Sequence, residues 1–150
     1  MPLEPKPADL PRIPGAVRLY QVASIITGVL LLLLCAEMVI KYGFHHELEL
    51  GGPQGFLAFV PNDTVTAVNL STGILIAHGW FYVLYLFSDF RLWSLMRWPF
   101  SRFILIALGG VVPTLSFFVE TRISREVKAY LARRQQAEAS PAAPATGALR

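Results

Sequence analysis

The stretch Ser71–Phe90 reads STGILIAHGWFYVLYLFSDF, and its only formally charged residue is Asp89, next to its end. A helix needs about 20 predominantly apolar residues to cross the roughly 30 Å hydrocarbon core of a lipid bilayer. The stretch meets that length, and it places one histidine, His78, where water is scarce. We therefore predict a transmembrane helix over residues 71–90.

Polar side chains recur along this helix at steps of 4, 3 and 4 residues, namely His78, Tyr82, Tyr85 and Asp89. Such steps place residues on one face of a helix. One interpretation is a polar stripe that lines a path through the membrane. The alternative is structural, because buried tyrosines usually contribute packing and a single hydrogen bond.

The composition of the whole chain also indicates a membrane protein. The 150 residues are 54% hydrophobic, their mean hydropathy is +0.50, and the charged residues gather at the ends of apolar blocks. A bilayer sorts side chains in this way, whereas a water-soluble domain carries charge throughout. The basic residues do not cluster with exposed aromatics, which argues against nucleic-acid binding. The single cysteine, Cys35, permits no intrachain disulfide.

Two further segments are predicted to cross the membrane. The first covers residues 18–42 and has Glu37 as the only charge in its 22-residue apolar centre. A cleaved signal peptide is the alternative, but the apolar region is too long and no A-x-A cleavage site follows it. The other segment, residues 101–120, contains 17 consecutive uncharged residues, with a kink expected at Pro113. The predicted fold is an all-α polytopic membrane protein with three transmembrane helices.

The remaining segments are expected to lie outside the hydrocarbon core. Residues 1–16 contain five prolines, and residues 135–150 are rich in alanine, proline and glutamine, so we expect both to be disordered. The connection between the first two spans is rich in Gly, Pro, His, Asn and acids. Its apolar piece, Gly55–Val60, is too short to cross a membrane and is placed at the interface.

Two segments are predicted to contact the lipid surface. A surface linker helix between the second and third spans contains Trp93 and Trp98, and tryptophan favours headgroup depth. Residues 123–134 form a basic amphipathic helix that would bind anionic lipids. The basic residues assigned to this contact are Arg122, Arg125 and Lys128.

Basic residues predict the orientation, because cytoplasmic loops carry an excess of lysine and arginine. Three spans would place six of them on each side of the membrane, since the tail would lie opposite the N-terminus. The first helix usually dominates, and Lys6, Arg12 and Arg18 precede it. We therefore predict a multi-pass protein of the cell membrane with a cytoplasmic N-terminus.

The chain resembles a family of small bacterial integral membrane proteins, domain of unknown function 3817. The resemblance covers roughly residues 17–122 and is carried by Met38-Val39-Ile40-Lys41-Tyr42, His78-Gly79, Tyr82-Val83-Leu84-Tyr85 and Pro113 through Glu120. It implies a three-helix membrane protein and implies no particular activity. The chain departs from the family at Thr27-Gly28, where a Glu-Gly pair is usual, and at Val39, where proline is usual.

Four ionisable residues are predicted to share one leaflet, because chain direction alternates through three spans: Glu37, Lys41, His78 and Glu120. Charges in lipid are costly and should find partners. The functional interpretation is a proton-binding or ligand-binding cluster. The structural interpretation has Lys41 reaching the headgroups and His78 joining two helices by a hydrogen bond.

A metal site and an enzymatic site are both disfavoured. His45, His46 and His78 lie on one side of the membrane, with Glu47 and Glu49 nearby, and imidazole with carboxylate suits zinc or nickel. However, no HxxxH or HxH spacing occurs, so we predict no metal and no cofactor. There is no nucleophile elbow, phosphate loop or paired-carboxylate motif, and we predict that the protein is not an enzyme.

Two functions remain. The leading hypothesis is a non-enzymatic small membrane protein that aids assembly or modulation of a larger membrane system. A small-residue face on the first helix, Ser24 and Gly28, would suit a helical partner. The alternative is an oligomeric proton-coupled small transporter or channel that uses the His78 stripe. The expected partners are the lipid bilayer, further copies of the chain or a larger membrane protein.

Overall fold

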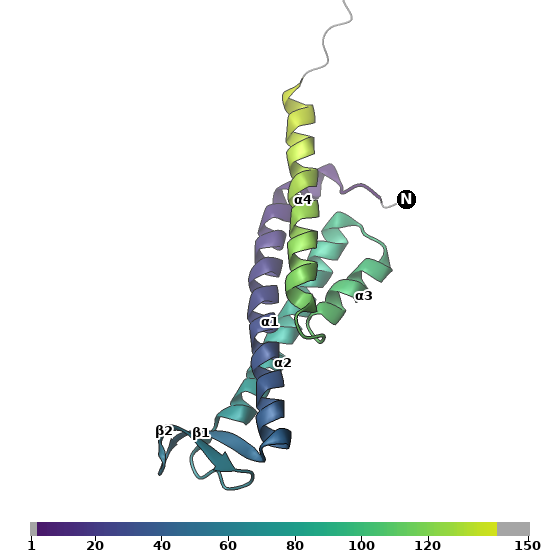
Figure 1. Cartoon of the computed structure of the whole chain (residues 1–150). Helices are drawn as coiled ribbons and strands as arrows, with labels where there is room; N and C mark the ends of the chain where they lie inside the picture. Colours follow the sequence, from purple (N-terminus) through teal and green to yellow (C-terminus); the bar gives the residue numbers. More distant parts are fainter. Residues whose placement is uncertain (1–2, 141–150) are drawn as a thin grey trace, which may run out of the picture.

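A computed structural model describes residues 3–140 of the chain. The fold is mostly helical and adds one small sheet (Figure 1). In chain order the elements are the 3-10 helix η1 (Pro7–Arg12), α1 (Ile13–Gly43), β1 (His46–Gly52), β2 (Gly55–Pro61), β3 (Val68–Asn69), α2 (Leu70–Met96), α3 (Phe100–Gly109) and α4 (Leu115–Ala139).

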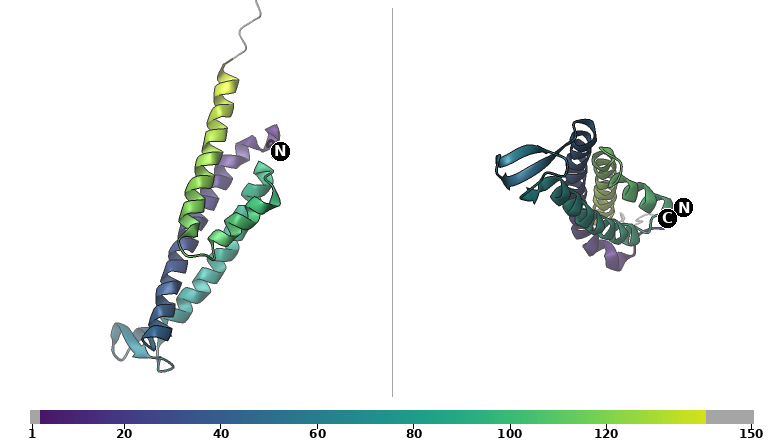
Figure 2. Two further views of the ribbon diagram at one scale, coloured as in Figure 1. Left: turned by 45° about the vertical axis from the view of Figure 1, so that its right-hand side comes forward. Right: turned by 90° about the horizontal axis from the view of Figure 1, so that it is seen from below.

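Helices α1 and α2 pack along each other in opposite directions and form the framework of the molecule (Figures 1 and 2). The Thr27 hydroxyl donates a 3.0 Å hydrogen bond to the Phe81 carbonyl midway along the pair. Asn69 begins α2 as its N-cap, because its side chain accepts from the Thr72 amide at 2.9 Å.

These two helices are long and apolar enough to cross a membrane. In their most apolar 18-residue stretches, only 33% of α1 and 11% of α2 is buried inside the chain. A core helix of a water-soluble protein would be buried far more completely, so the exposed apolar faces suit a lipid surrounding.

The predicted third span is wrong as a single helix, because residues 101–120 fold into a hairpin. Helix α3 has 10 residues, about 15 Å of length, which is half of a hydrocarbon core. The chain then turns through residues 110–114 and returns as α4 (Figure 2). An ion pair between Arg102 and Glu126 joins the outer parts of the two helices. Two glycines before the turn and Pro113 within it interrupt the helix more strongly than the predicted kink.

The hairpin brings the far end of α4 back beside the N-terminus, where Arg134 lies 3.7 Å from the Glu4 carboxylate. The apolar stripe of the predicted surface helix is occupied, since Ile123 and Val127 are buried in the core that α4 shares with α1. Helix α4 therefore stands alongside α1, and the prediction of a helix lying flat on a lipid surface is wrong for these residues.

The predicted surface linker helix is also a different structure. Helix α2 continues without a break to Met96, and Arg97 ends it in the left-handed conformation (φ 52°). Trp98 is buried in the core, and the guanidinium of Arg102 lies 5.1 Å from its ring. Trp93 packs against the rings of α2 and α3, which are Phe90, Phe100 and Phe103. Both tryptophans therefore hold α3 against α2.

The two ends predicted to be disordered are partly helical. Within residues 1–16, η1 is a 3-10 helix, and α1 already begins at Ile13, whose side chain is fully buried. Within residues 135–150, α4 continues to Ala139. Residues 1–2 and 141–150 lie outside the described part of the chain.

The all-α prediction misses a small antiparallel sheet between α1 and α2. Its strand order is β2-β1-β3, and Glu49 of β1 faces Ala58 of β2 and Asn69 of β3. The alternating sequence His46-Glu47-Leu48-Glu49-Leu50 has the period of two that favours a strand. The sheet closes the end of the α1–α2 pair opposite the N-terminus (Figure 1).

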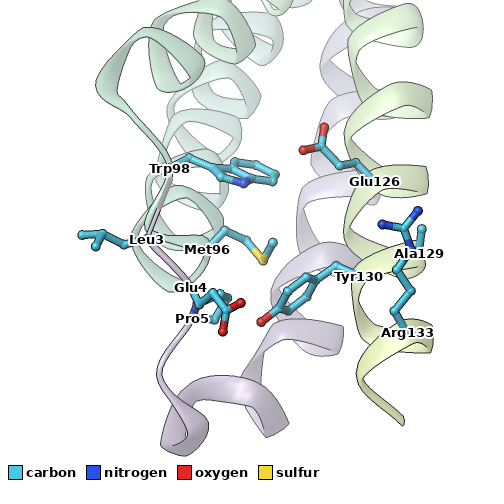
Figure 3. A pocket seen from close by; sticks show the side chains of 9 residues that line it. All are labelled: Leu3, Glu4, Pro5, Met96, Trp98, Glu126, Ala129, Tyr130 and Arg133. Carbon is cyan, nitrogen blue, oxygen red and sulfur yellow. The ribbon is translucent and has the colours of Figure 1, made fainter. Parts of the chain in front are cut away.

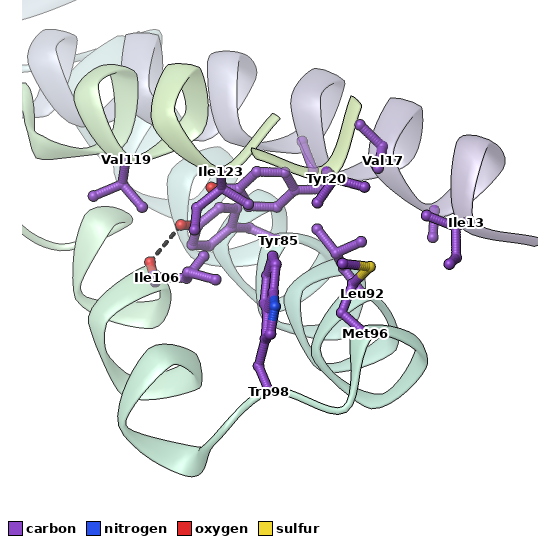
Figure 4. Packing of buried hydrophobic residues seen from close by; sticks show 13 residues of the cluster. Ile13, Val17, Tyr20, Tyr85, Leu92, Met96, Trp98, Ile106, Val119 and Ile123 are labelled. Carbon is purple, nitrogen blue, oxygen red and sulfur yellow. Dashed lines mark hydrogen bonds between the residues drawn. The ribbon is translucent and has the colours of Figure 1, made fainter. Parts of the chain in front are cut away.

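The hydrophobic core lies at the other end, where α4 packs against α1 and α3 packs against α2 (Figure 4). Its largest fully buried side chains include Tyr20 of α1 and Tyr85 of α2. This core also contains polar groups, and they form the candidate site.

Candidate functional site

Asp89 is the centre of the site. Its side chain is 0% exposed on the inner face of α2, among the core residues. Neither carboxyl oxygen has a hydrogen-bond partner, and no lysine or arginine within residues 3–140 forms an ion pair with it. A buried polar group without a partner costs free energy, so Asp89 does not stabilise the fold through a hydrogen bond or an ion pair.

Tyrosine hydroxyls from α2 bind the end of α3 beside this carboxyl. Tyr85 donates to the Ile106 carbonyl (Figure 4), and Tyr82 donates to the Ala107 carbonyl at 3.3 Å. The last carbonyls of a helix have no partner within it, and lipid offers none. The tyrosines of the predicted stripe therefore allow a helix to end halfway along the bundle.

Close packing at this point requires glycine. A Cβ at Gly110 would lie 2.6 Å from the Tyr82 ring and 3.0 Å from Tyr85, and one at Gly109 would lie 3.0 Å from the Tyr85 hydroxyl. The pair Gly109-Gly110 therefore lets α3 end directly against the two rings.

Tyr20 of α1 lies between Asp89 and the half-buried carboxyl of Glu120 on α4. Its hydroxyl lies near Tyr85 and Ser24 without forming a hydrogen bond to either, and it is within Coulombic reach of both carboxyls. The Tyr20 and Tyr85 rings are 5.9 Å apart. The titratable groups around Asp89 are thus Tyr20 from α1 and Tyr82 and Tyr85 from α2, while Glu120 of α4 lies on the Tyr20 side.

Glu120 differs from Asp89 because it has partners. Gln21 Nε2 and Ser124 Oγ each donate to its Oε1 at 2.9 Å. One turn away, the hydroxyls of Ser24 and Ser116 lie 2.9 Å apart and continue the polar contact between α1 and α4. These bonds fix α4 to α1 and leave Asp89 as the unpaired acid of the site.

His78 extends the polar line toward the sheet. Its ring stacks on Tyr82 with centroids 6.2 Å apart, and Tyr82 lies 6.2 Å from Tyr85. The buried Nδ1 of His78 has no hydrogen-bond partner in the described chain. Rings from His78 to Tyr20 therefore follow one another at about 6 Å, and Asp89 lies at the far end of this line.

The structure does not bring the four predicted cluster residues together. Glu37 and Lys41 lie near the sheet, where Glu37 accepts a hydrogen bond from Ser71 and Lys41 Nζ lies 2.6 Å from Glu47 Oε1. Glu120 lies in the opposite half, beside Gln21. The reason is the hairpin, because α4 begins in the middle of the bundle and runs back toward the N-terminus.

The acids of the sheet both have hydrogen-bond partners. Glu49 Oε1 accepts from the Thr66 amide at 2.6 Å and the Ala67 amide at 2.8 Å, and these bonds hold the pKa of Glu49 below its ordinary value. The hydrogen bond from Lys41 likewise holds the pKa of Glu47 below its ordinary value. Both carboxylates act as structural acceptors that order the loop before α2.

His45 and His46 do not form a metal site with these acids. His45 is exposed with a left-handed backbone (φ 57°), and His46 Nδ1 lies 2.6 Å from the Phe44 carbonyl. Across residues 3–140, no three His, Cys, Asp or Glu side chains come together in a way that could hold a metal ion.

A pocket of about 410 Å³ opens at the N-terminal end of the bundle (Figure 3). Met96 and Tyr130 point into it, with Glu4 and Trp98 at its sides. The Tyr130 hydroxyl is buried and has no hydrogen-bond partner among residues 3–140. Met96, Leu92 and Asp89 follow one another on the buried face of α2, so the pocket and the buried acid lie along the same side of this helix.

Sequence reasoning did not select Tyr20 or Gln21. The signal was the spacing of Tyr20, Ser24 and Thr27, which recur at steps of 4 and 3 along α1 and make a second polar stripe. Because α1 packs along α2, this stripe of α1 contacts the stripe of α2 that contains Tyr85 and Asp89.

Comparisons with known proteins identify relatives of the chain. A family model described as "Domain of unknown function (DUF3817)" matches residues 17–125. An uncharacterized protein of Mycobacterium leprae is 29% identical over 109 residues, which are 73% of this chain and 72% of the relative. Uncharacterized proteins of Mycobacterium bovis and Mycobacterium tuberculosis are each 30% identical over 118 residues, 79% of this chain and 81% of each relative. No solved structure gives a significant match.

Proposed function

The chain belongs to the DUF3817 family, and we propose that it is a membrane protein that takes up protons at Asp89 as part of proton-coupled transport. The observation that carries the proposal is a fully buried aspartate with no hydrogen-bond or ionic partner in the described chain. Ionisable residues inside membranes that lack a structural partner are typical of proton and ion pathways.

The half-length hairpin supports a transport role. Backbone that leaves the helical conformation at membrane depth is tolerated where protein buries it or where it lines a cavity. Transporters place such broken helices beside their binding sites, near the middle of the bilayer. Here the end of α3 lies against Tyr82 and Tyr85, one turn from Asp89.

A route to Asp89 is proposed from the N-terminal end. The pocket lined by Met96 and Tyr130 admits water, and a rotamer change of Leu92 would join it to the carboxyl. Beyond Asp89 the line of Tyr20, Tyr85, Tyr82 and His78 offers exchangeable protons toward the sheet. Leu92 would thus act as the gate on one side.

The hairpin also strengthens the orientation proposed for the protein. Of the basic residues within residues 3–140, eleven lie toward the N-terminal end, because α4 returns there, and Lys41 lies toward the other end. The eleven are Lys6, Arg12, Arg18, Arg91, Arg97, Arg102, Arg122, Arg125, Lys128, Arg133 and Arg134. The positive-inside rule then places the N-terminus, the pocket and the end of α4 in the cytoplasm.

Proton flux in liposomes tests the proposal. Purified full-length protein is reconstituted with a pH-sensitive dye inside the vesicles, and a pH gradient is imposed. Asp89→Asn should reduce protein-dependent flux at least tenfold, whereas Asp63→Asn, on the exposed loop of the sheet end, should leave it unchanged. Absence of flux in the folded wild-type protein, or equal flux in the Asp89 variant, would contradict proton transport.

Assembly or modulation of a larger membrane system is the second candidate, and Trp80 favours it. This side chain is 73% exposed about 15 Å along α2, at mid-bilayer depth, where lipid-facing tryptophan is uncommon. A helix of a second copy or of another protein would cover it. The small-residue face of α1, which the sequence suggested for contact with a partner helix, is instead covered by α4 of the same chain, because Gly28 packs against Phe117.

Trp80→Leu separates the two candidates. If the protein is a partner subunit, the variant should lose a co-purifying membrane protein in mild detergent, and the wild type should show no flux alone. If the protein transports as an oligomer of itself, the variant should run at a smaller size in detergent and lose flux with it.

A further inference from the structure

The small sheet has one acidic face and one apolar face. Its acidic side chains are buried and three side chains of its apolar face are exposed, which is the reverse of a sheet in a water-soluble protein. Residues directly opposite one another in an antiparallel pair share a face. The register therefore places Glu47 and Glu49 on one face with Val60 and Ala58, and places Leu48 and Leu50 on the other. Joining these two leucines on the second face are Leu57, Phe59 and Val68.

The two acids of the acidic face are bound by the chain itself, whereas Phe56 on the same side of β2 is 81% exposed. Glu49 is held by the amides and hydroxyl of the loop at Thr66 and Ala67, and Glu47 is held by Lys41. The apolar face is uncovered, with Leu57, Phe59 and Val68 exposed by 55%, 59% and 58%. An exposed continuous apolar face of this kind marks a contact surface.

The position of the apolar face identifies what it contacts. The β1–β2 hairpin extends sideways from the end of the α1–α2 pair and does not continue along its axis (Figures 1 and 2). Ile40 and Phe44 at the end of α1 line a hollow of about 420 Å³ together with His46 and Phe59 of the sheet. The apolar face is therefore continuous with the exposed apolar surface of α1.

We propose that the apolar face of the β2-β1-β3 sheet rests on the lipid bilayer, at the boundary between headgroups and acyl chains. The proposal rests on the membrane placement of α1 and α2 given under the proposed function. No charged residue occurs from Leu50 to Asn62, so the contact suits neutral lipid and needs no anionic headgroup. The acidic face and its covering loop then face water on the side opposite the cytoplasm.

Lipid explains the pattern better than a second copy of the chain. Pairing with another sheet would use the backbone edge of β2, and the edge residue Pro61 has no amide to donate. The exposed side chains of the apolar face lie instead on β2 and β3, namely Leu57, Phe59 and Val68, and Phe59 lies beside the end of α1. A flat apolar face beside a lipid-facing helix fits a bilayer surface.

Site-directed spin labelling tests the proposal in the full chain. In a Cys35→Ser background, single cysteines are introduced by Leu57→Cys, Phe59→Cys and Val68→Cys, labelled with a nitroxide, and reconstituted in neutral phosphatidylcholine vesicles. Collisions with oxygen report lipid, and collisions with a water-soluble nickel chelate report water. The ratio of oxygen to nickel collisions should be several-fold higher at these three positions than at Thr64→Cys, on the exposed loop covering the acidic face.

A reference position separates failure of this inference from failure of the membrane placement. Val29→Cys lies on the exposed face of α1, in its middle. If position 29 reports lipid while positions 57, 59 and 68 report water, the sheet does not contact the bilayer. Spin–spin broadening at Phe59→Cys would mean that two copies meet there and would also overturn the proposal. If position 29 itself reports water, the membrane placement of α1 is wrong.

Discussion

The two ends of the bundle bury carboxyl groups in opposite ways. At the sheet end, Glu47 and Glu49 each accept hydrogen bonds from nearby donors, and Glu37 accepts one from Ser71. At the hairpin end, Asp89 is equally buried and accepts no hydrogen bond from the part of the chain that the structure describes. Burial alone therefore does not identify a functional acid in this protein. The absence of partners separates a group available to a proton from groups that hold the fold.

The largest effect is expected from breaking the hairpin end at Gly110. Gly110→Ala places a methyl group 2.6 Å from the Tyr82 ring, so α3 must move away from the tyrosines that bind its carbonyls. Overpacking of this kind costs about 2 kcal/mol of folding free energy. The cost should appear as a lower unfolding midpoint in detergent. Gly79→Ala is the matched control on α2, because a Cβ there has no neighbour within 4 Å; an equal loss in both variants would contradict the packing.

A smaller effect is expected at the sheet end, where Glu49 should behave as a structural acid. Glu49→Gln weakens the bonds to the Thr66 and Ala67 amides, and hydrogen exchange of these amides should become roughly tenfold faster.

The same bonds set a pH dependence. They lower the pKa of Glu49, so its stabilising contribution is complete above the ordinary carboxyl pKa and is lost as the pH falls through the lowered value. Exchange at Thr66 should therefore rise on acidification in the wild type. In Glu49→Gln this rise should be smaller. An identical pH profile of exchange in both proteins would show that ionisation of Glu49 does not cause the pH dependence.

Asp89 should show the reverse stability effect. Asp89→Asn removes a buried acid that has no partner, so the unfolding midpoint in detergent should stay the same or rise, by up to about 1 kcal/mol in stability. Together with lost proton flux, this result would sharpen the contrast with Glu49, whose variant should lose stability and keep flux. A clear loss of stability in Asp89→Asn would mean that the carboxylate has a structural partner and that the contrast is mistaken.

The smallest effect concerns the hairpin turn. Thr114 has a left-handed backbone (φ 68°), which is unfavourable for a β-branched residue and tolerable for asparagine. Thr114→Asn should stabilise the protein by about 0.5 kcal/mol in the same detergent unfolding measurement. Any loss of stability would show that the threonine side chain contributes a contact that outweighs the strain.

The candidate site was only partly accessible to sequence reasoning. The helical spacing of Tyr82, Tyr85 and Asp89 places them on one face whatever the fold, because that relation depends on local geometry alone. Whether that face meets Tyr20 and the end of α3 depends on how helices pack, which one segment does not encode. The grouping of Glu37 with Glu120 relied on three full spans, and it fails with the hairpin.

What the sequence by itself determined is the local character of each segment. The long apolar runs specify α1 and α2, because composition and length decide whether a helix suits lipid. The alternation of polar and apolar residues over residues 46–50 also indicates a strand, although the glycine, proline and histidine residues around it favour a loop.

Tertiary structure alone decided whether residues 101–120 cross or turn back. Gly109-Gly110 and Pro113 permit either a kinked span or a hairpin, since both conformations need the same weak point in the helix. The turn is stabilised because Tyr82 and Tyr85, which lie 25 and 21 residues before their acceptors, donate to the Ala107 and Ile106 carbonyls in the last turn of α3. An open helix end in an apolar surrounding is too costly without such donors, and their position is a property of the packed bundle.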